Sequence, residues 1–132
     1  MCEKVLKTCL ADRYPRDAFL LADKLSITCF EKESDIRVLV EDQLKTCGVE
    51  YFDFYLMHAL SAERHSQFTA SNAYKVVAEL KAEGKLRHVG FSFHDSAEVL
   101  DQILTEHPEL EFVQLQFNYV DYNDPKVQLL WC

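Results

Sequence analysis

The sequence is poor in the residues that interrupt regular structure, with three glycines and three prolines among 132 residues. Collagen-like and low-complexity chains need far more of both, so a composition that is 48% hydrophobic and 27% charged indicates a globular protein. No apolar run approaches the roughly 20 residues that a membrane-spanning helix requires. The start of the chain also lacks the apolar core of a signal peptide. We therefore expect a single cytoplasmic domain over residues 1–132 that does not bind a membrane.

Basic residues are scarce relative to acidic ones: 14 Lys and Arg stand against 22 Asp and Glu, a formal net charge of −8. Nucleic acids are held mainly through Lys and Arg on phosphates, so this balance argues against nucleic-acid binding. The five cysteines are scattered without a Cys-x-x-Cys pair and are expected to stay reduced. Three histidines lack metal-ligand spacing with one another or with His58, so no metal site and no metal-dependent hydrolase are expected. They are His88, His94 and His107.

Apolar segments of two kinds alternate along the chain. Short, nearly continuous apolar runs are typical of buried strands, and they lie at 19–23, 52–57, 89–92 and 112–117. Apolar residues at helical spacing predict a helix over 2–12 and three more: one that Ser34 caps and Gly48 ends, one from Ala73 to its stop at Gly84, and one that runs from the cap at Asp95 to His107. Asp124-Pro125 predicts the start of another. Asp95 and Glu98 have the spacing of a capping box for the helix that follows them.

Strands that alternate with helices form parallel units with right-handed crossovers, which gives an α/β fold. Two architectures fit about four such units: part of a TIM (β/α)8 barrel, or a small doubly wound sheet. A complete barrel needs about 250 residues, so this chain would hold roughly half of one. The helix predicted from Asp124 is short where the chain stops, and no strand precedes the first helix. Both observations favour a partial barrel that is truncated at both ends.

The polar segment from Ser61 to Ser71 follows the second predicted strand. Two interpretations stay equally open: an ordinary exposed connection, or a substrate loop in which Arg64, His65 and Phe68 contact a substrate, since barrel enzymes place such loops at this position. His65 is expected to face water.

Each predicted strand ends in or near a residue that can do chemistry. Lys24, His58 and Ser92 mark the ends of the first three strands, and the fourth offers Gln114, Gln116 and Asn118. The carboxyl ends of parallel strands meet at the edge of the sheet where active sites lie. Lysine can lower the pKa of a neighbour, and neutral imidazole can donate a hydrogen bond to a carbonyl oxygen. The combination suits carbonyl chemistry, although strands also end in polar residues simply because the sheet meets water there.

Four segments carry a more specific signal: RYPRDAFLLADKL, YFDFYLMH, GKLRHVGFSFH and FVQLQFNY. In this order they resemble the aldo-keto reductases, and among these the chain looks closest to bacterial oxidoreductases that often carry an iron–sulfur tail after the barrel. The resemblance implies a (β/α)8 barrel that moves a hydride between a nicotinamide cofactor, NADP(H) or NAD(H), and a small carbonyl or alcohol. Asp53, in the second segment, matches a family aspartate that we interpret as structural.

The resemblance also implies a role for each strand-end residue. Lys24 matches the family's catalytic lysine, which keeps the pKa of an acid tyrosine low, and His58 matches the histidine that orients the substrate carbonyl. Ser92 and Gln114 match residues that hold the nicotinamide carboxamide, whereas Phe93 stands where many members have asparagine. The acid tyrosine and the aspartate that pairs with the lysine have no counterpart here. We therefore expect this chain to be an internal fragment of an oxidoreductase that is inactive alone.

The alternative function is a noncatalytic α/β half-barrel scaffold that associates with another chain. Half a barrel has two open sheet edges and an inner face that the missing strands would have covered, so self-association is expected of it. The residues on predicted strands that could supply such a surface are Phe19, Leu21, Phe52, Phe54 and Phe117.

Overall fold

The structure is a computed structural model that describes residues 2–116 and 120. Its strands are β1 (Ala22–Leu25), β2 (Phe52–Leu60), β3 (Leu86–Phe93) and β4 (Phe112–Leu115). Its α-helices are α1 (Cys2–Leu6), α2 (Glu33–Cys47), α3 (Ala62–Ala70), α4 (Ala73–Ala82) and α5 (Ala97–Glu106), with shorter helical turns at 7–11, 16–18 and 27–29. The four strands form one sheet in the order β1-β2-β3-β4, and every neighbouring pair is parallel. The helix predicted from Asp124 lies outside the described residues.

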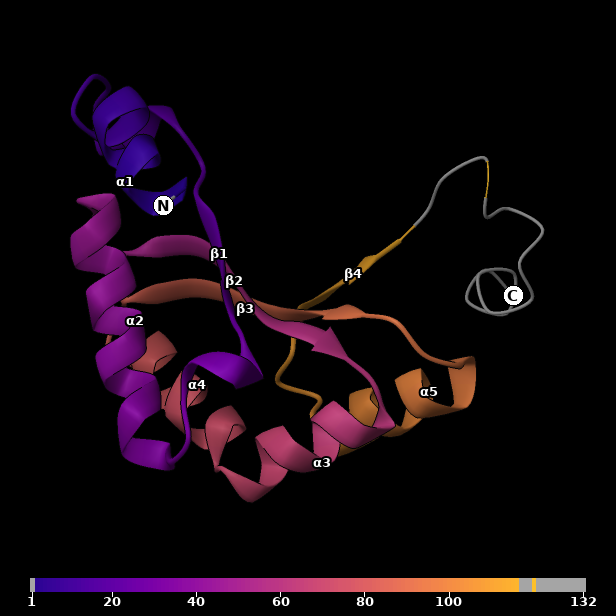
Figure 1. Ribbon diagram of the computed structural model, residues 1–132. Helices are drawn as coiled ribbons and strands as arrows, with labels where there is room; N and C mark the ends of the chain where they lie inside the picture. Colours follow the sequence, from indigo (N-terminus) through magenta and orange to yellow (C-terminus); the bar gives the residue numbers. More distant parts are fainter. Residues whose placement is uncertain (1, 117–119, 121–132) are drawn as a thin grey trace.

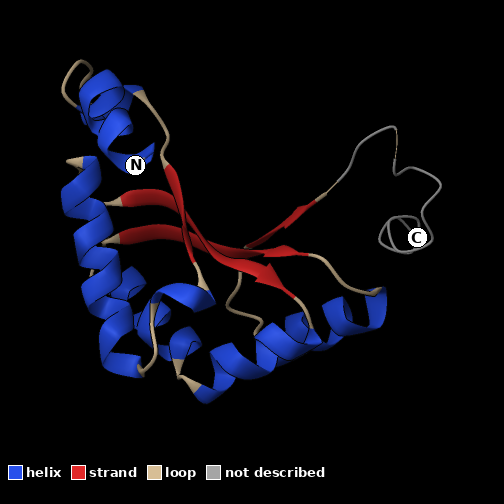
Figure 2. Ribbon diagram, in the orientation of Figure 1, coloured by secondary structure: helices blue, strands red, loops and turns tan. Residues whose placement is uncertain are grey.

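The helices are distributed unequally over the two faces of the sheet. Figures 1 and 2 show α2, α3, α4 and α5 on one face, which we call the covered face, while the opposite, open face carries no helix among the described residues. A doubly wound sheet carries helices on both faces, whereas a barrel wall carries them outside only. One-sided cover and sequential strand order therefore favour the partial barrel over the doubly wound sheet. Among the described residues no helix has both the length and the apolar character needed to cross a membrane.

The hydrophobic core lies between the sheet and the helices. Alternate residues of the strands, such as Tyr55 and Phe91, point into this layer and are fully buried. The Tyr55 hydroxyl donates a hydrogen bond to Gln43 of α2 at 2.6 Å, which shows which face this side chain occupies. From the helices, residues such as Ile36 and Leu80 complete the core and are also fully buried. The strands read as continuous apolar runs because the open face carries apolar side chains as well.

The run of apolar residues predicts that the first strand begins at residue 19, but β1 begins at Ala22. The reason is the buried carboxylate of Asp53, which accepts a hydrogen bond from the Leu21 backbone N–H at 2.9 Å. Regular pairing with β2 starts one residue later, where Ala22 lies beside Phe54. Leu20 points to solvent and is 73% exposed. As a result Lys24 lies within the strand and not beyond its end.

The interpretation of Ser61–Ser71 as an exposed connection is wrong, because this segment forms helix α3. Ser61 caps the helix by accepting the Arg64 backbone N–H at 3.4 Å, and Asp95 accepts that of Ala62 at 2.9 Å. The capping-box spacing of Asp95 and Glu98 predicted Asp95 as the N-cap of the following helix, but the N-cap of α5 is Ser96, whose backbone N–H donates to Asp95 at 2.8 Å. His65 is buried at 6% exposure and Phe68 is fully buried, so neither faces water nor reaches a substrate.

Candidate active site

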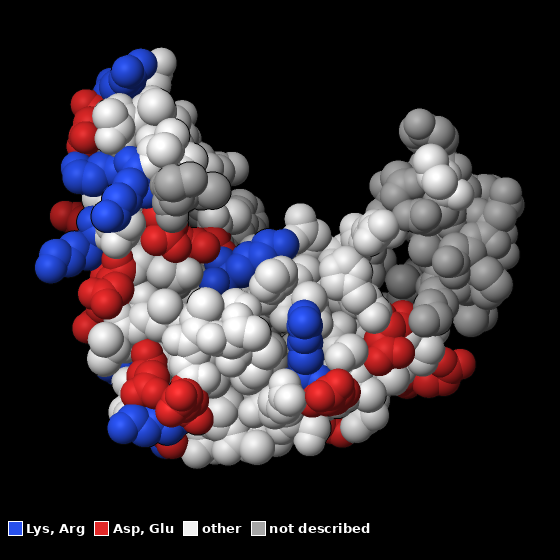
Figure 3. Space-filling view, in the orientation of Figure 1, with Lys and Arg blue, Asp and Glu red and all other residues white. Residues whose placement is uncertain are grey.

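Lys24 and Gln114 meet on the open face of the sheet although they stand on its two outer strands. The Lys24 Nζ donates a hydrogen bond to Gln114 Oε1 at 2.7 Å. Strands β2 and β3 lie between β1 and β4 in the sheet. Side chains of the two outer strands can therefore meet only because the sheet curves around its open face. Figure 3 shows this face as a hollow with basic side chains beside it, while acidic side chains gather over α2 and along the lower side of the molecule.

His58 lies near the carboxyl end of β2 on the same face. Lys24 is paired in register with Leu56, two residues before His58, so the two chemical groups share one end of the sheet. The imidazole is exposed. Partial burial, together with the positive charges of Lys24, Arg64 and His94, lowers the pKa of His58. At neutral pH the ring is therefore mainly uncharged and able to donate a hydrogen bond to a carbonyl oxygen.

A bulge in β2 follows His58 directly. Pairing with β3 shifts between Met57 and Leu60, and Ala59 has a φ of 54°, a left-handed conformation that costs a non-glycine residue about 1 kcal/mol. Two side chains hold the bulge: Ser92 Oγ accepts the Ala59 N–H at 2.7 Å, and Arg64 donates to the Ala59 carbonyl at 3.1 Å. Neither apolar periodicity nor spacing marks this bulge in the sequence.

Ser92 and Gln114 are direct neighbours in the β3–β4 register. A carboxamide needs a donor for its oxygen and an acceptor for its NH2 group, and a hydroxyl beside a side-chain amide offers both. The Ser92 oxygen accepts from Ala59 and its hydroxyl proton is a potential donor, although the residue is only 3% exposed, whereas the exposed Gln114 retains its NH2 group and a second lone pair. The donor set thus fits the amide end of a nicotinamide. Phe93 is 1% exposed and packs against Phe91 in the core, away from this position.

Asp53 lies at the opposite, amino-terminal end of β2. Its carboxylate accepts hydrogen bonds from Arg16 at 2.6 Å, from the Leu21 N–H at 2.9 Å and from Arg87 at 3.1 Å. Burial raises its pKa, but the Arg16 and Leu21 hydrogen bonds and both guanidinium charges outweigh this and hold the pKa below its ordinary value. These contacts support the structural interpretation of Asp53.

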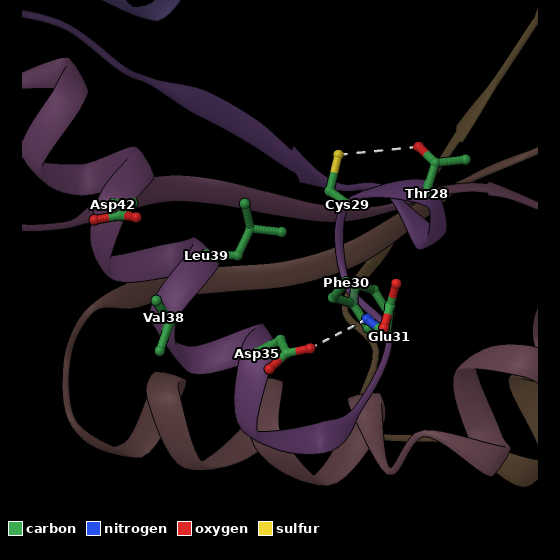
Figure 4. Close-up of a pocket in the computed structure, with 8 residues that line it drawn as sticks. All are labelled: Thr28, Cys29, Phe30, Glu31, Asp35, Val38, Leu39 and Asp42. Atoms are coloured by element: carbon green, nitrogen blue, oxygen red, sulfur yellow. Dashed lines mark hydrogen bonds between the residues drawn. The ribbon is translucent and has the colours of Figure 1, made fainter.

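A separate groove of about 400 Å³ lies beyond the end of β1, against α2 (Figure 4). It contains three carboxylates and no Lys or Arg, so it does not suit the phosphates of a dinucleotide. Its lining residues are Thr28, Cys29, Phe30, Glu31, Asp35, Val38, Leu39 and Asp42. The Asp35 carboxylate accepts the Glu31 backbone N–H at 3.3 Å, so part of the acidic charge serves the start of α2.

The model of the aldo/keto reductase family matches residues 2–130 of the sequence. The chain belongs to the aldo/keto reductase family. The resemblance of the four strand segments to this family is thereby confirmed. A search of curated proteins found no match.

Solved aldo/keto reductases share the fold of this family member. The enzyme from Brucella melitensis is 20% identical, with a TM-score of 0.73 over 97% of this chain and 48% of that one. The Klebsiella pneumoniae enzyme in complex with NADP and acetate is 21% identical, with a TM-score of 0.71 over 98% of this chain and 44% of that one. Aldose reductase from Schistosoma japonicum is 20% identical, with a TM-score of 0.71 over 98% of this chain and 48% of that one.

The chain thus spans slightly less than half the length of these solved aldo/keto reductases. At such identity the likeness concerns the fold. Together with the four parallel strands and one-sided helices, it confirms that the chain is a partial TIM (β/α)8 barrel.

Proposed function

We propose that this chain supplies the lysine, the histidine and the nicotinamide-amide contacts of an NAD(P)H-dependent aldo-keto reductase. The observation that carries the proposal is the meeting of Lys24 and Gln114 across the open face, at the same sheet end as His58. The substrate class is a small molecule with a carbonyl or alcohol group. Free cysteines at Cys9, Cys29 and Cys47 are in keeping with a cytoplasmic protein.

The proposed roles follow from the chemistry of each side chain. The Lys24 ammonium, oriented by Gln114, favours the deprotonated form of a nearby tyrosine hydroxyl and so prepares it to act as an acid. His58, uncharged at neutral pH, donates a hydrogen bond to the substrate carbonyl oxygen. Ser92 and Gln114 hold the carboxamide of NADP(H) or NAD(H). When bound, the nicotinamide supplies or accepts the hydride.

The 132-residue chain by itself is proposed to be one partial domain without useful reductase activity. Among the described tyrosines, Tyr55 and Tyr74 are buried in the helix layer, away from Lys24. A positioned general acid contributes typically about 10²–10⁴-fold to a rate. Ser92 and Gln114 alone also offer too few contacts to offset the cost of immobilising a dinucleotide.

Binding and turnover test this proposal separately. Nicotinamide mononucleotide, added to ¹⁵N-labelled chain, should shift the Ser92 backbone and Gln114 side-chain amide signals, and Gln114→Leu should abolish the response. Shifts confined to another part of the chain would contradict the proposed cofactor contacts. No NADPH oxidation is expected with a generic aldehyde. Turnover that disappears in His58→Ala would overturn the inactivity and show that a tyrosine of this chain acts as the acid.

A second candidate function is a scaffold that pairs with another copy. Within the described sheet β1 and β4 each have one strand neighbour, and the rings of Phe54 and Phe112 meet edge-to-face on the open face, 5.5 Å between centroids. Two other residues predicted for this surface, Leu21 and Phe52, are buried instead. Phe19 packs partly against the core, and Phe117 lies outside the described residues.

Light scattering coupled to size-exclusion chromatography tests the scaffold. A stable dimer whose population falls with Phe112→Ser would support it, and a monomer at high concentration would exclude it.

A further inference from the structure

Three side chains with metal-binding groups converge in the helix layer, on the side of the sheet away from Lys24 and His58. They are His65 of α3, Glu106 at the end of α5, and His107, which follows it. A ring nitrogen of each histidine and a carboxylate oxygen of Glu106 all lie within 4.8 Å of one another. Over forty residues separate His65 from the other two in the sequence, and only the packing of α3 beside the end of α5 unites them.

His65 is held at both ring nitrogens. Its Nδ1 lies 2.7 Å from the Tyr74 hydroxyl, and its Nε2 lies 2.8 Å from Glu106 Oε2. A hydroxyl can donate to Nδ1 or accept from it, so Tyr74 supports either neutral tautomer of the imidazole. The tautomer with the proton on Nδ1 leaves the Nε2 lone pair facing Glu106, the arrangement that a metal ion between them requires.

His107 is oriented in the manner of a metal ligand. Its Nδ1 lies 3.0 Å from Glu109 Oε1. An ionised carboxylate only accepts hydrogen bonds, so this contact places a proton on Nδ1 and leaves the lone pair of neutral His107 on Nε2. Metal-bound histidines commonly have such a carboxylate partner, which fixes the ring and raises its basicity. The ring also stacks on Tyr74, with centroids 3.6 Å apart and planes 9° from parallel.

Glu106 supplies the carboxylate group of this cluster. Its Oε1 accepts a hydrogen bond from Gln102 at 2.8 Å, which leaves Oε2 directed at His65. The Glu106 side chain is 47% exposed, whereas that of His65 is 8% exposed, so an ion and a water molecule can enter from the Glu106 side.

We propose that His65, Glu106 and His107 bind one Zn²⁺ ion, with water as the fourth ligand. Two imidazole nitrogens and a carboxylate oxygen form a donor set that Zn²⁺ prefers and that Ca²⁺ and Mg²⁺, which favour oxygen, do not. Zinc bonds of about 2.0–2.2 Å at tetrahedral angles place ligand atoms about 3.3 Å apart. The 2.8 Å contact between His65 and Glu106 therefore has to widen by about half an ångström, while ligand atoms of the group that lie up to 4.8 Å apart have to move closer. The bound ion ties α3 to the end of α5.

Calorimetric titration of ZnCl2 into the reduced 132-residue chain tests the site. We expect one equivalent to bind and the thermal unfolding midpoint to rise with zinc concentration. Glu106→Gln and His107→Gln should each weaken binding by more than tenfold, because each removes a ligand. Tyr74→Phe removes only the partner of His65 Nδ1 and should weaken binding by about 10–100-fold, as for other groups that orient metal ligands.

The matched control is His88→Gln, because His88 also has a glutamate partner, Glu111 at 3.2 Å, but lies outside the proposed site. Its zinc affinity should equal that of the unmodified chain. Co²⁺ added in place of Zn²⁺ should give tetrahedral d–d absorption without a thiolate charge-transfer band. Equal affinity in all variants, a thiolate band, or no binding would overturn the proposal. Glu106 is exposed, so Glu106→Gln remains informative if the His107 variant does not fold.

Discussion

The two faces of the sheet place histidines in opposite settings. On the open face His58 is exposed, and the charged groups that act on it among the described residues, Lys24, Arg64 and His94, all disfavour a charged imidazole. In the helix layer His65 is buried between a tyrosine hydroxyl and the Glu106 carboxylate. The first ring is open to a molecule that arrives from solution, whereas protein groups hold the second at both ring nitrogens and orient it toward Glu106. The role of a histidine here follows from its surroundings and not from its place in an apolar or polar segment.

Phenylalanines on the two faces provide the largest expected contrast. Phe91 is fully buried in the core, so Phe91→Ala should lower the free energy of unfolding by about 3–5 kcal/mol. Phe54 is half-buried on the open face and contacts Phe112 and His88, so Phe54→Ala should cost about 1–2 kcal/mol. Urea unfolding followed by circular dichroism measures both. Equal losses would mean that another chain covers the open face in solution.

The next largest effect concerns the buried carboxylate of Asp53. Asp53→Asn weakens the hydrogen bonds from Arg16 and Leu21 and should cost about 2–3 kcal/mol at pH 7. The folded-state pKa of Asp53 lies below its unfolded value of about 3.9, so this stability exists above that pH and is lost as the pH falls. The gap between the two proteins should therefore close in acid.

Unfolding at pH 7, 5 and 3 measures the Asp53 effect. Asp12→Asn is the matched control, since Asp12 forms an exposed ion pair with Lys7 and its loss should cost less than about 1 kcal/mol. A gap between Asp53→Asn and the unmodified chain that stays constant with pH would show that packing, and not charge, explains the loss.

Asp23, also on the covered side, is expected to behave in the opposite way. Burial raises its pKa to about 6, the Lys24 backbone N–H opposes this, and the charge of Glu3 adds to it. The folded state holds this proton more tightly than the unfolded state, so stability declines as the pH rises from about 4 to above 6. Asp23→Asn should stabilise the protein by about 1 kcal/mol at pH 8, a value reduced for partial exposure, and by less at pH 4. Thermal unfolding at pH 4 and pH 8 measures whether Asp23→Asn stabilises the protein more at the higher pH.

Much of the fold could be predicted from the sequence because long segments have a clear period. Helices α2 and α4 carry several buried residues each at helical spacing, and α5 carries Ile103 together with the partly buried Val99 and Leu100. Strands β2 and β3 are nearly continuous apolar runs. Helix α3 was missed because it buries only His65 and Phe68 within an otherwise polar segment. The start of β1 was misplaced because a distant carboxylate, that of Asp53, takes the Leu21 N–H before regular pairing begins.

The candidate site, too, has parts that could be predicted from the sequence and parts that could not. Lys24, His58 and Ser92 could be proposed because parallel strands bring their carboxyl ends together, whereas Gln114 was distinguished from Gln116 and Asn118 by the resemblance to the aldo-keto reductases. The bulge at Ala59 could not, since it depends on a hydrogen bond from one strand to the Ser92 side chain of the next. The group of His65, Glu106 and His107 was likewise invisible, because spacing rules find metal ligands that lie close together in sequence.

The smallest expected effect tests the electrostatic setting of His58. Partial burial and the charges of Lys24, Arg64 and His94 lower its pKa, so Lys24→Met should move the pKa upward, toward the ordinary value of about 6.5. The change should be modest, since burial and the other charges remain. Imidazole ¹⁵N shifts recorded against pH measure the His58 pKa, and His88, beside Glu111, serves as an internal control that should not change.

Lys81→Met is the matched control variant, because Lys81 pairs with Glu111 and does not act on His58. If Lys24→Met leaves the His58 titration unchanged while Lys81→Met shifts it, the two catalytic candidates do not share one end of the sheet in solution, and the proposed site is wrong.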